Sequence, residues 1–138
     1  MKPVRFHSWN ISPNEAIAIQ NNLREKIVFS SISDDIKYIG GTAVAFEAGK
    51  NIIHAALTIL KYPSLEVVEQ NGVTQEITFD YISGLLTFRE GAPLMSLFRK
   101  TSQDIDLIVF HSHGQSHPRK FGLASHLGVL LDLSLIHI

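Results

Sequence analysis

The first strong signal along the chain is the start of a helix near residue 13. The segment Ser12-Pro13-Asn14-Glu15 combines a hydroxyl N-cap, a proline at the first helical position and a glutamate that completes a capping box. Apolar residues then recur at helical spacing at Ala16, Ile19, Leu23 and Ile27. The pattern predicts an amphipathic helix that reaches about Val28 and covers a sheet.

The middle of the chain is rich in strand signals. Residues 36–46 and 51–62 are β-rich runs joined through Gly49-Lys50-Asn51, which predicts a hairpin. Residues 65–70 and 73–79 flank Asn71-Gly72, the dipeptide that best tolerates the two positive φ angles of a type I′ turn. An antiparallel meander is therefore expected.

The spacing of apolar residues changes after Gly84. Residues 85–98 suit helical packing, with Gly91 and Pro93 predicting a break or a helix start. Residues 105–110 are apolar on both faces, as in a strand buried between layers, and residues 123–131 predict a last helix. These elements add up to an α/β fold with a mixed sheet.

Composition narrows the class of protein. With 138 residues, 45% of them hydrophobic and 18% charged, the chain has room for one domain. The formal charge of −1 gives no overall field toward nucleic acid or anionic membrane, so a polyanion site must be a local patch. The absence of cysteine excludes disulfides and thiolate metal sites. Because no signal peptide or long apolar run is visible, we expect a cytoplasmic protein with no membrane partner.

Histidines gather just after the predicted buried strand. His111, His113, His117 and His126 include a His-x-His step, and ligands tend to bind beyond the carboxyl ends of such strands. Converging imidazoles would bind Zn²⁺ or Mn²⁺ and support a metal hydrolase. With seven histidines in the chain, a chance cluster is the competing interpretation.

Other candidate residues have a chemical and a structural interpretation each. Glu90 could ligate Mg²⁺ through oxygen, or merely favour the dipole at the mouth of a helix. Arg119 and Lys120 could bind phosphates or form a solvated loop. Tyr81 and Ile82 could wedge between stacked bases or plug the edge of the core.

Two long segments, in this order, resemble the endonuclease V family. Residues 80–91 (DYISGLLTFREG) resemble its PYIPGFLAFREG segment, and residues 112–128 resemble its GHGxxHPRxxGLASHLG segment. The resemblance implies one RNase H-like domain over residues 1–133. It also implies a Mg²⁺-dependent nuclease, with Mn²⁺ as a second possible ion, that acts as a monomer. Its substrate would be DNA, cut on the 3′ side of deoxyinosine, or inosine-containing RNA as in some relatives.

Family roles carry over at the matching positions. The resemblance implies that Glu90 is a metal ligand and catalytic, and that His117 lies near the cleavage site and is catalytic. It implies DNA binding by the wedge, the glycines that approach the lesion and the adjoining loop: Tyr81, Ile82, Ser83, Gly84, Gly114, Arg119, Lys120 and Gly122. Ser83 stands where the family usually has proline, which should loosen the turn.

Two expected metal ligands are missing. Residues 39–44 resemble the first-strand motif of the family, but Ala43 occupies the place of its aspartate, and His111 occupies that of a second aspartate. Mg²⁺ prefers carboxylate oxygen, so these losses predict impaired cleavage while binding survives. The alternative is a catalytically dead module that binds the inosine lesion. A hydrolase built on the histidine cluster is the third hypothesis.

The last residues depart from the family as well. Residues 134–138 do not match it, so we expect the C-terminal part of the family domain to be missing and the chain to be truncated or frame-shifted. Without its next strand, the run 105–110 would have an open, aggregation-prone edge. The expectation is a fold of marginal stability.

Overall fold

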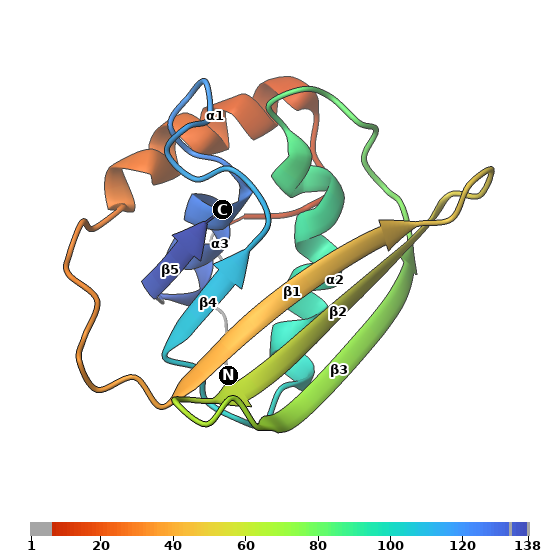
Figure 1. The fold of residues 1–138 in the computed structure, drawn as a ribbon. Coiled ribbons are helices and arrows are strands. Elements are labelled where there is room, and N and C mark those ends of the chain that lie inside the picture. Colours follow the sequence, from red (N-terminus) through yellow and green to blue (C-terminus); the bar gives the residue numbers. More distant parts are fainter. Residues whose placement is uncertain (1–6, 133, 138) are drawn as a thin grey trace.

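The computed structural model describes residues 7–132 and 134–137, with only the backbone of the latter segment. The helices are α1 (Pro13–Leu23), α2 (Leu86–Lys100) and α3 (Leu123–Leu131), and a 3₁₀ turn, η1 (Arg24–Lys26), follows α1. The strands are β1 (Tyr38–Phe46), β2 (Ile52–Lys61), β3 (Val67–Glu76), β4 (Leu107–Phe110) and β5 (Ser134–His137). Their order in the sheet is β3-β2-β1-β4-β5. The first three are antiparallel, whereas β4 is parallel to β1 and β5 parallel to β4 (Figure 1).

The core lies between one face of the sheet and the helices. Burial alternates along β2, where Ile53, Ala55, Leu57 and Ile59 are buried, as expected for a strand with one covered face. In Figure 1, α2 runs along β1–β3 and α3 lies behind β4. One cluster joins these strands to α2 and α3. Among the described residues, no helix has the length and apolar character needed to span a bilayer.

Helix α1 begins where the sequence predicts but ends earlier. The capping box is present, because Ser12 Oγ accepts from the Glu15 amide and Glu15 Oε2 accepts from the Ser12 amide, each at 3.2 Å. The helix stops at Leu23 and η1 ends at Lys26, so the predicted extension to about Val28 is wrong. Leu23 is the last buried residue of α1, Ile27 is only partly buried against the core, and Val28 is 82% exposed, so a longer helix would bury little more apolar surface.

The antiparallel meander is confirmed with one correction. Strands β1 and β2 form the predicted hairpin, and Gly49 has the positive φ (+73°) of its turn. The type I′ turn at Asn71-Gly72 is wrong, because both residues lie inside β3. Asn71 pairs with Leu57 and Gly72 with Ala56, so the long partner β2 holds this segment extended.

Helix α2 differs from the sequence-based prediction as well. The sequence predicts a break or a helix start at Gly91 and Pro93, but α2 is continuous, with Pro93 in its interior. Its buried face includes Phe88, Leu94, Leu97 and Phe98, so tertiary packing outweighs the hydrogen bond that proline cannot donate.

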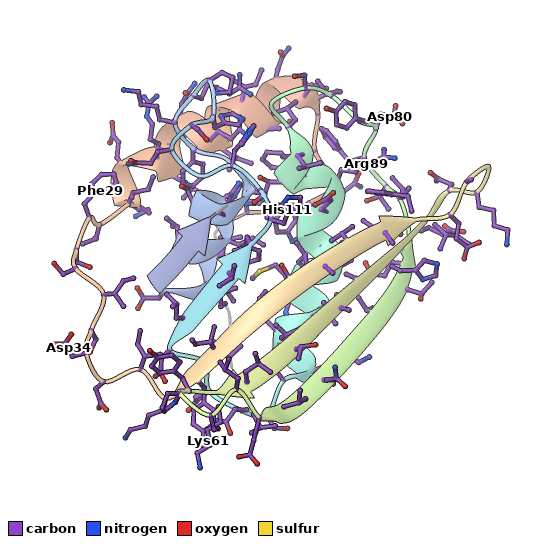
Figure 2. All side chains as sticks on the ribbon, in the orientation of Figure 1. Phe29, Asp34, Lys61, Asp80, Arg89 and His111 are labelled. Atoms are coloured by element: carbon purple, nitrogen blue, oxygen red, sulfur yellow. The ribbon has the colours of Figure 1, made fainter. Side chains whose placement is uncertain are left out.

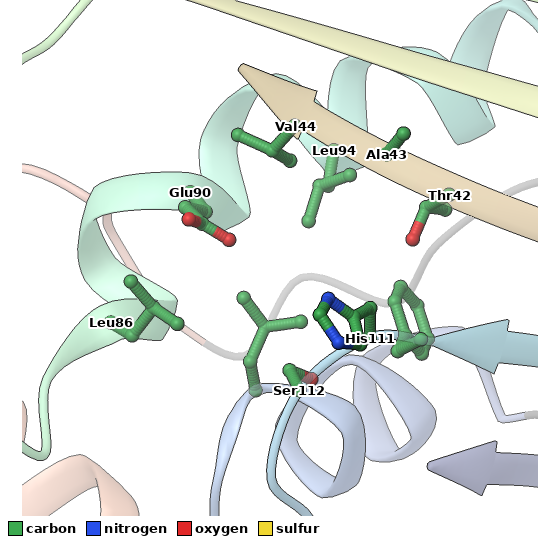
Figure 3. A pocket seen from close by; sticks show the side chains of 10 residues that line it. Thr42, Ala43, Val44, Leu86, Glu90, Leu94, His111 and Ser112 are labelled. Carbon is green, nitrogen blue, oxygen red and sulfur yellow. The ribbon is translucent and has the colours of Figure 1, made fainter. Parts of the chain in front are cut away.

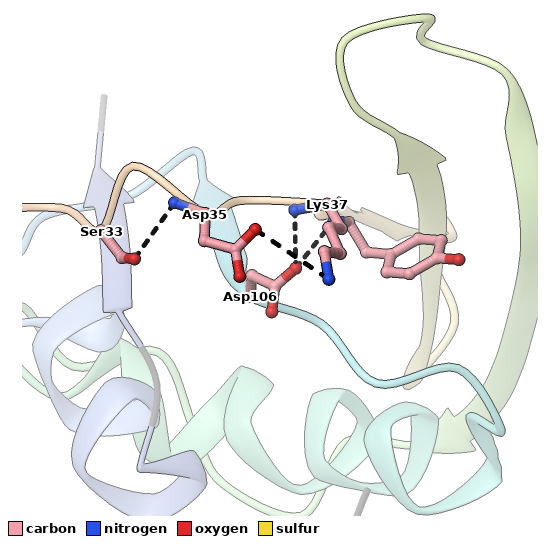
Figure 4. A network of polar contacts seen from close by, with 5 residues as sticks. Ser33, Asp35, Lys37 and Asp106 are labelled. Atoms are coloured by element: carbon pink, nitrogen blue, oxygen red, sulfur yellow. Dashed lines mark hydrogen bonds and ion pairs between the residues drawn. The ribbon is translucent and has the colours of Figure 1, made fainter.

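The parallel strands are tied together at their amino ends. Asp106 Oδ2 accepts hydrogen bonds from the amides of Lys37 and Tyr38, both at 2.9 Å (Figure 4). The Asp106 amide also donates to the Tyr38 carbonyl at 3.0 Å. These bonds fix the start of β1 beside the start of β4. The carboxyl ends of the two strands consequently open at the same edge of the sheet.

Strand β4 also has a neighbour on its other side. The backbone of Ser134–His137 forms β5, which pairs in parallel with all of β4 from Leu107 to Phe110. The expectation that β4 presents an open edge, with no further strand after it, is therefore wrong.

Candidate active-site pocket and wedge loop

A pocket of about 260 Å³ lies where β1, β4 and α2 meet. Gly41 pairs with Val109, and continuing this register by two residues brings Ala43 of β1 beside His111, which follows β4. Both residues line the pocket, and α2 adds Glu90 (Figure 3). Figure 2 places His111 just after β4. The structure thus brings together the three positions at which the family resemblance places metal-ligand carboxylates. Glu90 lies in the second turn of α2, not at the mouth of the helix.

Glu90 is the one carboxylate among the residues that line the pocket. Burial raises its pKa above the usual value, and the opposing effect of Arg89 is smaller. Thr42 and Ser112 add hydroxyls, and the buried Ser112 Oγ has no hydrogen-bond partner in the described part of the chain. The remaining walls are apolar, from Val44, Leu86, Leu94, Phe110 and Leu123.

This set of donors does not fit Mg²⁺. The ion needs several hard oxygen ligands in near-octahedral geometry. Glu90 supplies one carboxylate, and its raised pKa weakens it as a ligand. Ala43 offers a methyl group, and the imidazole of His111 suits softer ions. In residues 7–132, no three His, Asp, Glu or Cys side chains are grouped so as to hold a metal.

The hypothesis of a metal site built from the histidine cluster is also wrong within residues 7–132. His126 is fully buried in α3, and its Nε2 lies 2.7 Å from Nε2 of His7, so that one ring donates to the other. Burial holds the pKa of His126 well below its usual value. His117 faces a different loop, whereas His111 lines the pocket.

His117 takes part in fixing a turn and does not line the pocket. Its Nε2 donates to the Gly84 carbonyl at 2.7 Å, and its Nδ1 accepts from the Arg119 amide at 3.0 Å. These two bonds require the neutral Nε2–H tautomer. Burial is the main cause that lowers the pKa of His117, in keeping with that form. These bonds show that His117 stabilises the turn, and its catalytic role stays a prediction.

The candidate wedge stands out from the molecule. Tyr81 is 68% exposed and Ile82 36% exposed, so they do not plug the edge of the core. A turn follows, in which the Leu85 amide donates to the Ile82 carbonyl at 2.9 Å and Gly84 has a φ of +84°. We call residues 81–84 the wedge loop. Ser83, in the family's proline position, is exposed within it.

The second motif packs against this turn. A Cβ at Gly84 would lie 2.8 Å from Arg119 Nη2, and one at Gly122 would collide with the His113 carbonyl. Gly114 accepts a hydrogen bond from the Gly122 amide at 2.9 Å. Arg119 is half-buried, whereas Lys120 is exposed and available to a phosphate. The two predicted DNA-binding segments are therefore in direct contact.

Gln20 of α1 is a member of this site that sequence reasoning missed. It is fully buried, and its Nε2 donates to the Gly84 carbonyl at 2.9 Å while its Oε1 accepts from Arg119 Nε at 2.6 Å. The available signal was its spacing, since Gln20 lies on the buried stripe of α1 with Ala16 and Leu23.

The sheet order β3-β2-β1-β4-β5, with a pocket beyond the carboxyl end of β4, defines an RNase H-like fold. A family model described as endonuclease V matches residues 21–138. The chain belongs to the endonuclease V family.

Individual relatives agree with this assignment. Endonuclease V of Gloeobacter violaceus is 40% identical over 133 residues, which make up 95% of this chain and 54% of that protein. The crystal structure of endonuclease V from Streptomyces avermitilis superposes with a TM-score of 0.87 at 33% identity, covering 99% of this chain and 61% of that one. Endonuclease V of Ciona intestinalis, solved in complex with DNA containing an inosine, gives a TM-score of 0.81 at 28% identity, covering 90% of this chain and 56% of that one. The chain thus spans little more than half the length of these relatives.

Proposed function

We propose that this chain binds DNA at deoxyinosine through the wedge loop and that its Mg²⁺-dependent cleavage on the 3′ side of the lesion is impaired. The proposal rests on the combination of two features. Tyr81 and Ile82 are exposed on the hydrogen-bonded wedge loop, and the pocket at the family's metal-ligand positions has Glu90 as its single carboxylate. The first feature supports binding and the second supports impairment.

Binding by a wedge rests on simple energetics. A base that leaves the stack costs a few kcal/mol, roughly, and an apolar side chain that takes its place offsets part of that cost. Tyr81 and Ile82 are already exposed, so they can enter a duplex without leaving the core. Lys120 adds a positive charge in the adjoining loop for the phosphate backbone.

Impaired cleavage rests on the pocket. Hydrolysis of a phosphodiester by a Mg²⁺ enzyme needs the ion to polarise the phosphate and to orient water. The methyl of Ala43 and the ring of His111 cannot hold that ion beside Glu90. We propose no step through a metal in this chain, and we keep binding and cleavage as separable properties.

Fluorescence anisotropy tests the binding half of the proposal. The probes are two labelled duplexes that differ only in one deoxyinosine or deoxyadenosine, with an inosine-containing RNA strand as a third probe. We expect preference for the deoxyinosine duplex, and a loss of about tenfold for Tyr81→Ala, as for removal of one base-stacking contact. The matched control is Tyr62→Ala, another exposed tyrosine (48%) that lies outside the wedge loop. Equal affinity for the two duplexes would overturn the proposal, and preference for the RNA would replace DNA as the partner.

A further inference from the structure

The Gly84 carbonyl oxygen accepts three side-chain hydrogen bonds from two distant parts of the chain, α1 and the loop before α3. Gln20 Nε2 donates to it at 2.9 Å, His117 Nε2 at 2.7 Å and Arg119 Nη2 at 2.9 Å. A carbonyl oxygen has two lone pairs, so this acceptor is fully used. Gly84 closes the wedge loop, and its position is thereby fixed from α1 and from the loop before α3.

Gln20 contributes more than one bond to this arrangement. Its amide oxygen accepts from Arg119 Nε at 2.6 Å while its amide nitrogen donates to Gly84. The side chain therefore orients both the guanidinium of Arg119 and the carbonyl that the guanidinium contacts. Gln20 is fully buried and lies outside both family motifs.

We infer that Gln20 is a positioning residue that holds the wedge loop ready for insertion at the lesion. This inference rests on the proposed function, because the wedge loop has a role in recognition only if the chain binds deoxyinosine in DNA. Gln20 acts through Gly84 and Arg119 and touches no DNA itself. Its loss would free the turn, and the chain would then have to order the loop at the moment of binding, which lowers affinity.

Two substitutions separate the hydrogen bonds from the packing. Gln20→Met keeps the length and the apolar stem but removes both bonds. Gln20→Glu keeps an acceptor for Arg119 but turns an oxygen toward the Gly84 carbonyl. The matched control is Gln75→Met, because the Gln75 side chain also bridges two elements, β3 and α2, by donating to Ser96 Oγ at 2.9 Å and not to the wedge loop.

Hydrogen exchange of the free protein tests the loop role without DNA. The Leu85 amide is bonded to the Ile82 carbonyl within the turn, so its exchange reports on the order of the wedge loop. We expect Gln20→Met to speed this exchange by about tenfold or more. Amides of β2 should keep their protection, and Gln75→Met should leave the Leu85 amide unchanged. Unchanged exchange at Leu85 in Gln20→Met would overturn the inference.

A double-mutant cycle with Tyr81→Ala then tests the link to recognition. If Gln20 acts through the wedge, Gln20→Met weakens binding of the deoxyinosine duplex in the wild type, by about fivefold or more, and has little further effect once Tyr81 is truncated. Additive losses would show a general structural role and overturn the inference. If the wild type does not prefer deoxyinosine at all, the proposed function fails, and the exchange of the Leu85 amide alone decides whether Gln20 orders the loop.

Discussion

Glu90 of α2 and His111, which follows β4, line the same pocket although they come from different elements of the fold. Ala43 of β1 lines it too, so the topology that gathers metal ligands is intact while the ligands have changed. The impairment that we propose is therefore a matter of side-chain chemistry at two of these three positions, Ala43 and His111.

Restoring the carboxylates should restore metal binding. We expect the double variant Ala43→Asp/His111→Asp to gain a rise in Tm on addition of Mg²⁺ or Mn²⁺, since a ligand that binds only the folded state stabilises it. The unchanged chain should show no such rise with Mg²⁺. Thermal unfolding with and without each ion measures the difference, and Glu90→Ala in the double variant serves as the control. A Mg²⁺-dependent rise in the unchanged chain would contradict our interpretation of the pocket.

Glu90 should cost stability near neutral pH. A carboxyl whose pKa is raised in the folded state stabilises the fold at low pH, and this contribution is lost as the pH rises through the folded pKa. We therefore expect Glu90→Gln to gain Tm relative to the wild type as the pH rises from about 4.5 toward 7. Thermal unfolding across this range measures the gain. A gain of the same size at every pH would show that the carboxyl does not titrate differently in the folded state.

Buried histidines should make the fold sensitive to acid. The pKa of His126 is held well below its usual 6.5, and the pKa values of His117 and His7 are also lowered. Below about pH 6.5 the unfolded chain binds protons that the folded chain does not, so the free energy of unfolding falls by about 1.4 kcal/mol per pH unit for each fully buried ring.

The variant His126→Phe isolates the contribution of this ring. It should flatten the pH dependence of denaturant unfolding, because phenylalanine fits an aromatic surrounding that includes Phe121 and Phe88 and does not titrate. Glu90 opposes this trend, with the opposite sign. An equally steep dependence in His126→Phe would assign the acid sensitivity to other groups.

A pair of glycine substitutions tests the corrected strand. Gly72 lies in β3 with room for a side chain, since a Cβ there would come no closer than 3.8 Å to the Ala55 carbonyl. We expect Gly72→Thr to stabilise the protein by about 0.5–1 kcal/mol, as for glycine replaced inside a strand. Gly49→Thr is the matched substitution in the hairpin turn, where the φ of +73° should make it destabilising. Denaturant unfolding compares the two, and a destabilised Gly72→Thr would favour the turn that the sequence alone predicts.

Local sequence patterns predicted which helices and strands form better than they predicted where those elements end. The capping box at Ser12 located the start of α1, and the β-rich runs joined through Gly49-Lys50-Asn51 located the hairpin, because these signals act over a few residues. The end of α1 and the extended Asn71-Gly72 depend on what distant segments offer for packing and pairing. The preference of Asn-Gly for a type I′ turn is a local property, and it takes no account of pairing with a ten-residue strand such as β2.

The same distinction between local and distant signals holds for the residues of the candidate site. The family motifs indicated Glu90, Tyr81 and Ile82, and the structure places the first in the pocket and the other two on the exposed wedge loop. The role of Gln20 could not be predicted, since it depends on a contact with Gly84, 64 residues later. The resemblance implied a catalytic role for His117, which stays a prediction, and the structure shows its two hydrogen bonds, to the Gly84 carbonyl and from the Arg119 amide.

The most direct test of the central claim is a nicking assay on a duplex carrying one deoxyinosine, with Mg²⁺ present and protein in excess over DNA. We predict that the duplex is bound but shows no nicking above background, because one carboxylate cannot hold the ion at the scissile phosphate. Mg²⁺-dependent cleavage on the 3′ side of the lesion, lost in Glu90→Ala, would contradict it.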